Sequence, residues 1–85
     1  MLGAAACGHP ASRAECEEIF ERSARIELTA QGVADPELVR QRIAEAHRAK
    51  GEPLVLQCVG RRVTHGAMSC LRRAQTAAAL DECLR

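Results

Sequence analysis

Apolar residues recur every three or four positions between residues 13 and 31, and charged residues fill most of the positions between them. This spacing is typical of an amphipathic helix whose apolar stripe faces a core. Ser12 stands three residues before Glu15, the pattern of a capping box at a helix start. Gly32 favours a left-handed helix end. We therefore predict a helix over residues 13–31 whose inner face carries Cys16, Ile19, Phe20, Ser23, Ile26 and Ala30.

A second apolar pattern predicts a helix over residues 36–50. Asp35 is followed by a proline, and this pair is typical of a helix start because aspartate caps the first turn and proline fits its first position. Lys50-Gly51 is expected to close the helix. Its inner face carries Val39, Ile43 and Ala46.

The C-terminal part predicts shorter elements. Residues 53–59 are too few for periodicity to separate a strand from a short helix. We expect a helix that ends at Gly60, because no second strand is predicted and a lone strand would leave its backbone unpaired. Thr64 and Thr76 are expected to cap two further helices. The predicted fold class is all-α, a small disulfide-stapled array of two longer helices and two or three short C-terminal ones.

The 85 residues suffice for one domain but offer little material for a core. The chain has one phenylalanine and neither tryptophan nor tyrosine, and much of its hydrophobic content is alanine, which buries little area at about 25 cal/mol per Å². Cross-links are therefore expected, because two disulfides at about 2–4 kcal/mol each match the stability of a domain this size. The cysteines available for them are Cys16, Cys58, Cys70 and Cys83.

Four cysteines allow three pairings, and the sequence leaves all three open. If the first two predicted helices form an antiparallel hairpin, the end of the second returns to the start of the first, which brings Cys58 near Cys16. Cys70 and Cys83 lie on two consecutive short helices and can face each other. We therefore prefer Cys16–Cys58 with Cys70–Cys83. The main alternative is the nested pairing, Cys16–Cys83 with Cys58–Cys70.

Residues 1–11 are interpreted as the remnant of a signal peptide and a lipid-anchor tether. Three alanines precede Cys7, and small residues before a cysteine are typical of the processing site of a bacterial lipoprotein. This interpretation requires an apolar run that continues upstream of Met1, because six residues without a positive charge are too few for a signal. Cys7 is then the predicted lipidation site, and residues 12–85 form one cysteine-stapled domain. The alternative is an alanine-rich terminus with a chance cysteine.

The charge balance argues against a nucleic-acid partner. Twelve basic and eleven acidic side chains give a net charge of +1, and no aromatic residue stands beside Arg61-Arg62 or Arg72-Arg73 to stack on bases. We interpret both pairs as solvated helix ends. No stretch of about 20 apolar residues is present to cross a bilayer, so membrane contact is expected only through a lipid on Cys7.

Residue spacing argues against metal binding and catalysis. Cys58, His65, Cys70 and Cys83 are ligand types that zinc prefers, but they include no C-x₂₋₄-C pair. A cysteine nucleophile needs a base within reach, and His65 is not a helical neighbour of Cys70. The sequence has no C-x-x-C pair, glycine-rich phosphate loop or H-E-x-x-H motif. We expect no catalytic residue, metal or cofactor, and a solvated His47.

Four cysteine-containing segments lie between about residues 15 and 84: Cys16-x-x-Ile19-Phe20, Cys58-Val59-Gly60-Arg61-Arg62-Val63-Thr64, Cys70-x-x-x-Ala74 and Leu80-Asp81-Glu82-Cys83. Their spacing resembles that of small four-cysteine helical exported proteins and lipoproteins of myxobacteria and related deltaproteobacteria. The resemblance implies an exported helical domain and no particular biochemical role. In that group the second helix runs straight into the following cysteine, whereas residues 51–53 intervene here. We therefore expect the helix to break at Gly51.

These observations lead to two hypotheses about function. The first is a non-enzymatic small helical domain of the bacterial envelope, lipid-anchored at Cys7 on the periplasmic or outer-membrane face, which acts by contact with a protein partner or structurally. The alternative is a cytosolic metal-binding or redox-sensing module that uses Cys58, Cys70 and Cys83 as thiols. Compartment separates the two, because disulfides persist outside the cytosol and thiols persist inside it.

Overall fold

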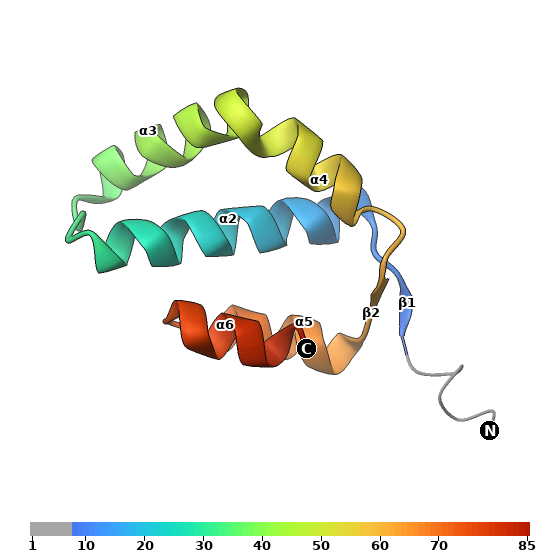
Figure 1. Ribbon diagram of the computed structural model, residues 1–85. Helices are drawn as coiled ribbons and strands as arrows, with labels where there is room; N and C mark the ends of the chain where they lie inside the picture. Colours follow the sequence, from blue (N-terminus) through green and yellow to red (C-terminus); the bar gives the residue numbers. More distant parts are fainter. Residues whose placement is uncertain (1–7) are drawn as a thin grey trace, which may run out of the picture.

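The computed structural model describes residues 8–85 and confirms the all-α class. Helix α2 lies in the middle of a flat molecule, with α3 and α4 along one side and α5 and α6 along the other (Figure 1). The principal extents are 48 × 23 × 15 Å. The elements are β1 (His9–Pro10), α2 (Arg13–Ala30), α3 (Pro36–Ala46), the π-helical turn η1 (His47–Gly51), α4 (Glu52–Cys58), β2 (Arg62–Val63), α5 (His65–Arg73) and α6 (Ala77–Cys83).

The predicted helix starts are confirmed at the level of individual hydrogen bonds. The Ser12 hydroxyl accepts from the Glu15 backbone N–H at 3.1 Å, and the Glu15 carboxylate accepts from the Ser12 backbone N–H at 2.9 Å. These bonds satisfy two donors that a helix end leaves open. The side chains of Asp35, Thr64 and Thr76 cap α3, α5 and α6.

The predicted helix break at Gly51 is wrong. The chain stays helical from Pro36 to Cys58, and Gly51 has a helical φ of −69°. The π-helical turn η1 stands just before Pro53, which has no N–H to donate to the carbonyl four residues earlier. The backbone hydrogen bond that Pro53 cannot make therefore falls next to a turn in which the hydrogen bonds already depart from the α-helical pattern.

Gly51 is required by a close approach to a side chain. A Cβ atom on this residue would lie 2.7 Å from Cγ of His47, closer than such atoms can stand without a shift. Gly66 in α5 has no such neighbour, because a Cβ there would meet only the Thr64 hydroxyl at 3.8 Å. Both glycines lie in helical segments, and they differ in the space around them.

Gly51→Ala should lower the free energy of unfolding by about 1–3 kcal/mol, because the added methyl group overpacks the His47 ring. Gly66→Ala should leave it unchanged or raise it by up to about 1 kcal/mol, because alanine favours helix over glycine. Urea denaturation followed by far-UV circular dichroism measures both. An increase in stability for Gly51→Ala would contradict the close approach.

Residues 8–11, which the sequence assigned to a tether, belong to the folded unit. β1 pairs antiparallel with β2, with His9 opposite Val63. The Ala11 N–H donates to the Arg61 carbonyl at 2.6 Å, and Ala11 is only 3% exposed. The described domain thus extends to Gly8. Strands of two residues each are too short to produce a periodic pattern in the sequence.

Two separate clusters of buried residues form the core. One packs α5 and α6 against α2, and the other packs the start of α2 against α4 and the ribbon. Only α2 contributes buried side chains to both clusters among the elements of residues 8–85. The first cluster comprises Ile26, Met68, Leu71, Ala74 and Leu80, and the second comprises Ala11, Cys16 and Val55.

Candidate functional site

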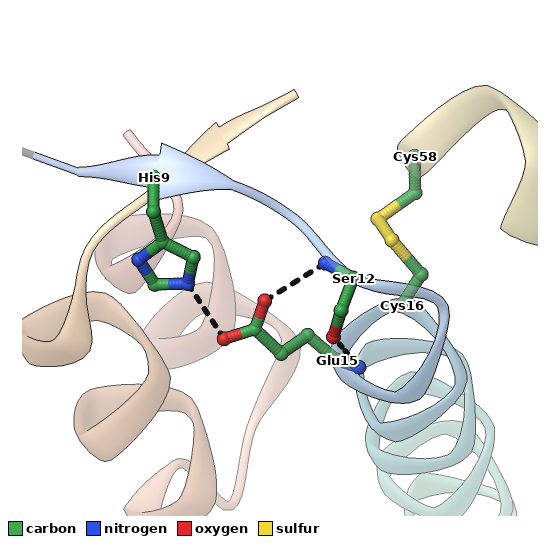
Figure 2. The surroundings of a disulfide bond; sticks show 5 residues. All are labelled: His9, Ser12, Glu15, Cys16 and Cys58. Atoms are coloured by element: carbon green, nitrogen blue, oxygen red, sulfur yellow. Dashed lines mark hydrogen bonds and ion pairs between the residues drawn. A yellow bond between two sulfur atoms is a disulfide. The ribbon is translucent and has the colours of Figure 1, made fainter. Parts of the chain in front are cut away.

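Two disulfides join the helices, in the pairing preferred from the sequence. Cys16–Cys58 ties the start of α2 to the end of α4 with a Cα–Cα distance of 5.8 Å (Figure 2). Cys70–Cys83 ties α5 to α6 with a Cα–Cα distance of 5.5 Å. Such bonds persist in oxidising compartments, so the structure favours an extracytoplasmic location. Cys7, the predicted lipidation site, lies outside the described residues.

The disulfides also remove the sulfur ligands of the zinc alternative. Cys58, Cys70 and Cys83 are all bonded to other cysteines and offer no thiolate to a metal. His65 is the first residue of α5, as predicted, and its ring centroid lies 5.0 Å from that of His9.

A hydrogen-bonded contact holds the ribbon against the start of α2. His9 Nε2 lies 2.8 Å from Glu15 Oε2, and the other carboxylate oxygen of Glu15 accepts from the Ser12 N–H (Figure 2). The backbone N–H of Ser12, followed by the hydrogen bond from His9, holds the pKa of Glu15 below its ordinary value. Glu15 therefore caps α2 and fixes β1 with one carboxylate.

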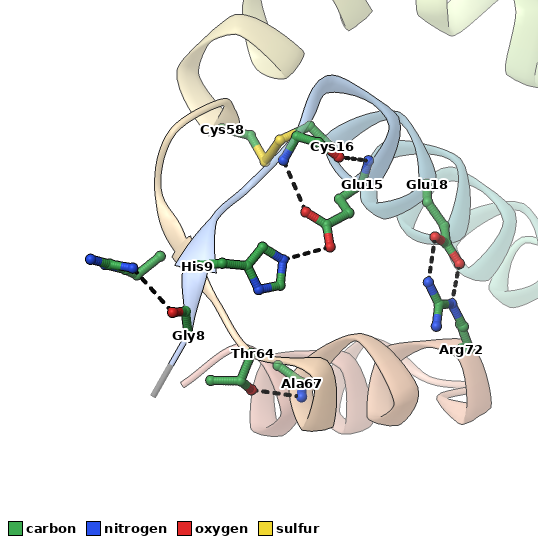
Figure 3. A network of polar contacts seen from close by, with 11 residues as sticks. Gly8, His9, Glu15, Cys16, Glu18, Cys58, Thr64, Ala67 and Arg72 are labelled. Carbon is green, nitrogen blue, oxygen red and sulfur yellow. Dashed lines mark hydrogen bonds and ion pairs between the residues drawn. A yellow bond between two sulfur atoms is a disulfide. The ribbon is translucent and has the colours of Figure 1, made fainter. Parts of the chain in front are cut away.

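A second ion pair connects α5 to α2. The Arg72 guanidinium donates to both oxygens of Glu18, at 2.5 and 3.0 Å (Figure 3). Arg72 lies in the last turn of α5 with its side chain 51% exposed, so it is a solvated helix end, as interpreted from the sequence, that also forms an ion pair with another helix. The hydrogen bond from Arg72 lowers the pKa of Glu18. A depressed carboxyl pKa means that this contact stabilises the fold above the ordinary pKa of 4.5, and that the contribution is lost as the pH falls below it.

A four-residue polar cluster joins α2, η1 and α4. Arg13 donates to both oxygens of Glu52, at 2.5 and 3.0 Å, and to Glu17 at 3.2 Å. His47 Nε2 lies 2.8 Å from the second oxygen of Glu17, and the His47 ring stands edge-on to Phe20 at 5.4 Å. The His47 side chain is 35% exposed and contacts both Glu17 and Phe20. The prediction of a solvated His47 is therefore corrected to a partly buried one.

Three members of this cluster, Glu17, His47 and Glu52, are residue types that can bind a metal ion, and they are the group of such residues found within residues 8–85. Ligand atoms of Glu17, His47 and Glu52 all lie within 4.8 Å of one another. Arg13 already bridges the two carboxylates, and its hydrogen bond lowers the pKa of Glu52. The two carboxylates and the His47 ring therefore already have hydrogen-bonding partners within the protein. Sequence reasoning missed this cluster because the three ligands come from three elements, α2, η1 and α4, whose arrangement depends on the fold.

An apolar groove of about 300 Å³ runs between α2 and the helical segment formed by α3, η1 and α4. Small side chains at Ala24 and Ala46 leave this space open. Arg42 and Lys50 line it and have no ion-pair partner among residues 8–85, while Glu27 also borders it. The groove can accept an elongated apolar group that carries an acidic side chain near its edge.

Comparisons with known proteins add no family to this description. No protein-family model matches the chain, and neither the curated proteins nor the solved structures give a match. In the described part of the chain, no helix combines the length and apolar character needed to span a membrane.

Proposed function

We propose that this chain is a non-enzymatic small helical domain of the bacterial envelope, attached to the membrane by a lipid on Cys7 and acting by contact with another protein. The observation that carries the proposal is the pairing of Cys16, Cys58, Cys70 and Cys83 in two disulfides. A core of two small clusters needs such bonds, and they persist outside the cytosol. The cysteine spacing that resembles exported myxobacterial proteins supports the same compartment.

The groove between α2 and the segment α3–α4 supplies the contact surface. Its apolar lining, with Arg42 and Lys50 beside it, fits one amphipathic helix of a partner that has acidic residues next to its apolar face. The other clusters described above are internally paired, since Arg13 and Arg72 each bind carboxylates of this chain. Their role in the proposal is to hold the walls of the groove in place.

The lipid and the compartment can be tested together in the native host. We expect the chain to incorporate a clickable fatty acid supplied to the cells, and Cys7→Ser to abolish the label while leaving the fold intact. Trapping with a thiol-alkylating reagent before reduction should leave the four disulfide cysteines unmodified. Equal labelling of Cys7→Ser would overturn the lipid anchor. Four alkylated thiols, or stoichiometric bound zinc, would instead support a cytosolic module.

A further inference from the structure

Helix α4 carries exposed aliphatic side chains on both flanks of the one residue that it buries fully. Val55 points inward and is 1% exposed. Leu54, Leu56 and Val59, on α4 and its C-terminal cap, are 46%, 59% and 42% exposed. A helix at a water-facing surface normally has polar residues at its exposed positions, and α4 has only Glu52 and Gln57. The three exposed aliphatic side chains around its C-terminal half are therefore candidates for contact with an apolar surface.

Two cations follow these apolar side chains directly. Arg61 and Arg62 are exposed, and neither forms an ion pair within the described residues. The carboxylate of α4 itself, Glu52, lies at the opposite end of the helix and is bound to Arg13. The α4–β2 corner, defined as residues 54–62, therefore combines exposed aliphatic side chains with unneutralised positive charge.

The corner is also fixed to the chain segment that follows Cys7. The Arg62 guanidinium donates to the carbonyl of Gly8 at 3.1 Å, the bond that ends on the labelled Gly8 in Figure 3. The Gly60 N–H donates to the Ala11 carbonyl at 2.9 Å. Figure 1 shows the end of α4 and β1 at the same end of the molecule. Because consecutive Cα atoms are about 3.8 Å apart, a lipid on Cys7 would hold this corner at the membrane surface.

We infer that the α4–β2 corner is a second membrane contact, which binds the surface of a bilayer that contains anionic phospholipid. The inference rests on the proposed lipid at Cys7 for its place in the cell. The aliphatic side chains enter the boundary between head groups and acyl chains, and the arginines pair with phosphates. A lipid chain alone gives a flexible attachment, whereas this contact gives the domain a fixed orientation on the bilayer.

The test uses the full chain with Cys7→Ser, so that no attached lipid contributes to binding. Sedimentation with vesicles measures partitioning onto phosphatidylcholine alone and onto phosphatidylcholine mixed with phosphatidylglycerol. We expect binding to the anionic vesicles only, weakened by added salt. Leu56→Ser/Val59→Ser and Arg61→Gln/Arg62→Gln should each reduce partitioning by about tenfold.

The matched control is Arg48→Gln/Arg73→Gln, which removes the same charge from two exposed arginines outside the corner. This variant should change partitioning by less than about twofold. Circular dichroism melts verify that each variant is folded. Absence of binding to anionic vesicles, or equal losses in the control and in Arg61→Gln/Arg62→Gln, would overturn the inference. The result is independent of the labelling experiment, because the protein here carries no lipid.

Discussion

Replacing Cys16 and Cys58 by alanine should lower the melting temperature more than replacing Cys70 and Cys83. The first disulfide closes a sequence separation of 42 residues and the second one of 13. In the chain-entropy model these loops correspond to about 4 and about 3 kcal/mol. At roughly 4–8 °C per kcal/mol for a domain of this size, the first double variant should lose about 15–30 °C.

Position adds to this difference between the two disulfides. Cys16 is 2% exposed and belongs to the smaller core cluster, so its loss also frees the end of α4. Loss of Cys70–Cys83 removes the covalent link between α5 and α6, but Leu80 still packs α6 against the larger cluster. Calorimetry of both double variants under oxidising conditions makes the comparison. Equal melting temperatures would show that loop length and position do not control stability here.

Leu71→Ala should reduce the free energy of unfolding by about 2–5 kcal/mol, a large fraction of the total for a domain of this size. Leu71 is 0% exposed and lies at the centre of the cluster that packs α5 and α6 against α2. Removing its side chain leaves a cavity that the disulfide between α5 and α6 prevents from closing fully.

The control for this substitution is Leu56→Ala, which makes the same change on a side chain that is 59% exposed. It should change stability by no more than about 0.5 kcal/mol. Urea denaturation of both variants at neutral pH provides the measurement. A loss at Leu56 as large as the loss at Leu71 would mean that the two clusters do not supply the stability of the fold.

Local signals predicted the helices well, because their causes are local. The capping box at Ser12, the Asp35-Pro36 start and the threonine caps each depend on residues within one helical turn, and each forms in the structure. The continuation of the helix through Gly51 was missed, because a glycine before a proline is also the usual signal of a helix end. In the structure the helix continues through Gly51, and the His47 ring, one turn earlier in the same helical segment, lies close to the glycine.

The polar contacts of the candidate site lay beyond sequence reasoning for a related reason. Glu18 and Arg72 are 54 residues apart, and Arg13 and Glu52 are 39 apart. Charged residues on a helix face are usually solvated, so nothing in their local pattern marks these four as paired. The apolar residues of α4 were visible in the sequence, but their exposure depends on which face α2 covers.

The order of the disulfides has a consequence for how the protein matures. From Cys16 onward the cysteines pair consecutively along the chain, the first with the second (Cys16–Cys58) and the third with the fourth (Cys70–Cys83). A chain that enters an oxidising compartment with its N-terminus first can thus form both native bonds in the order of emergence, without reshuffling. A free thiol at Cys7 would disturb this order by reaching Cys16 first. A lipid thioether on Cys7, as proposed, would remove that competing thiol.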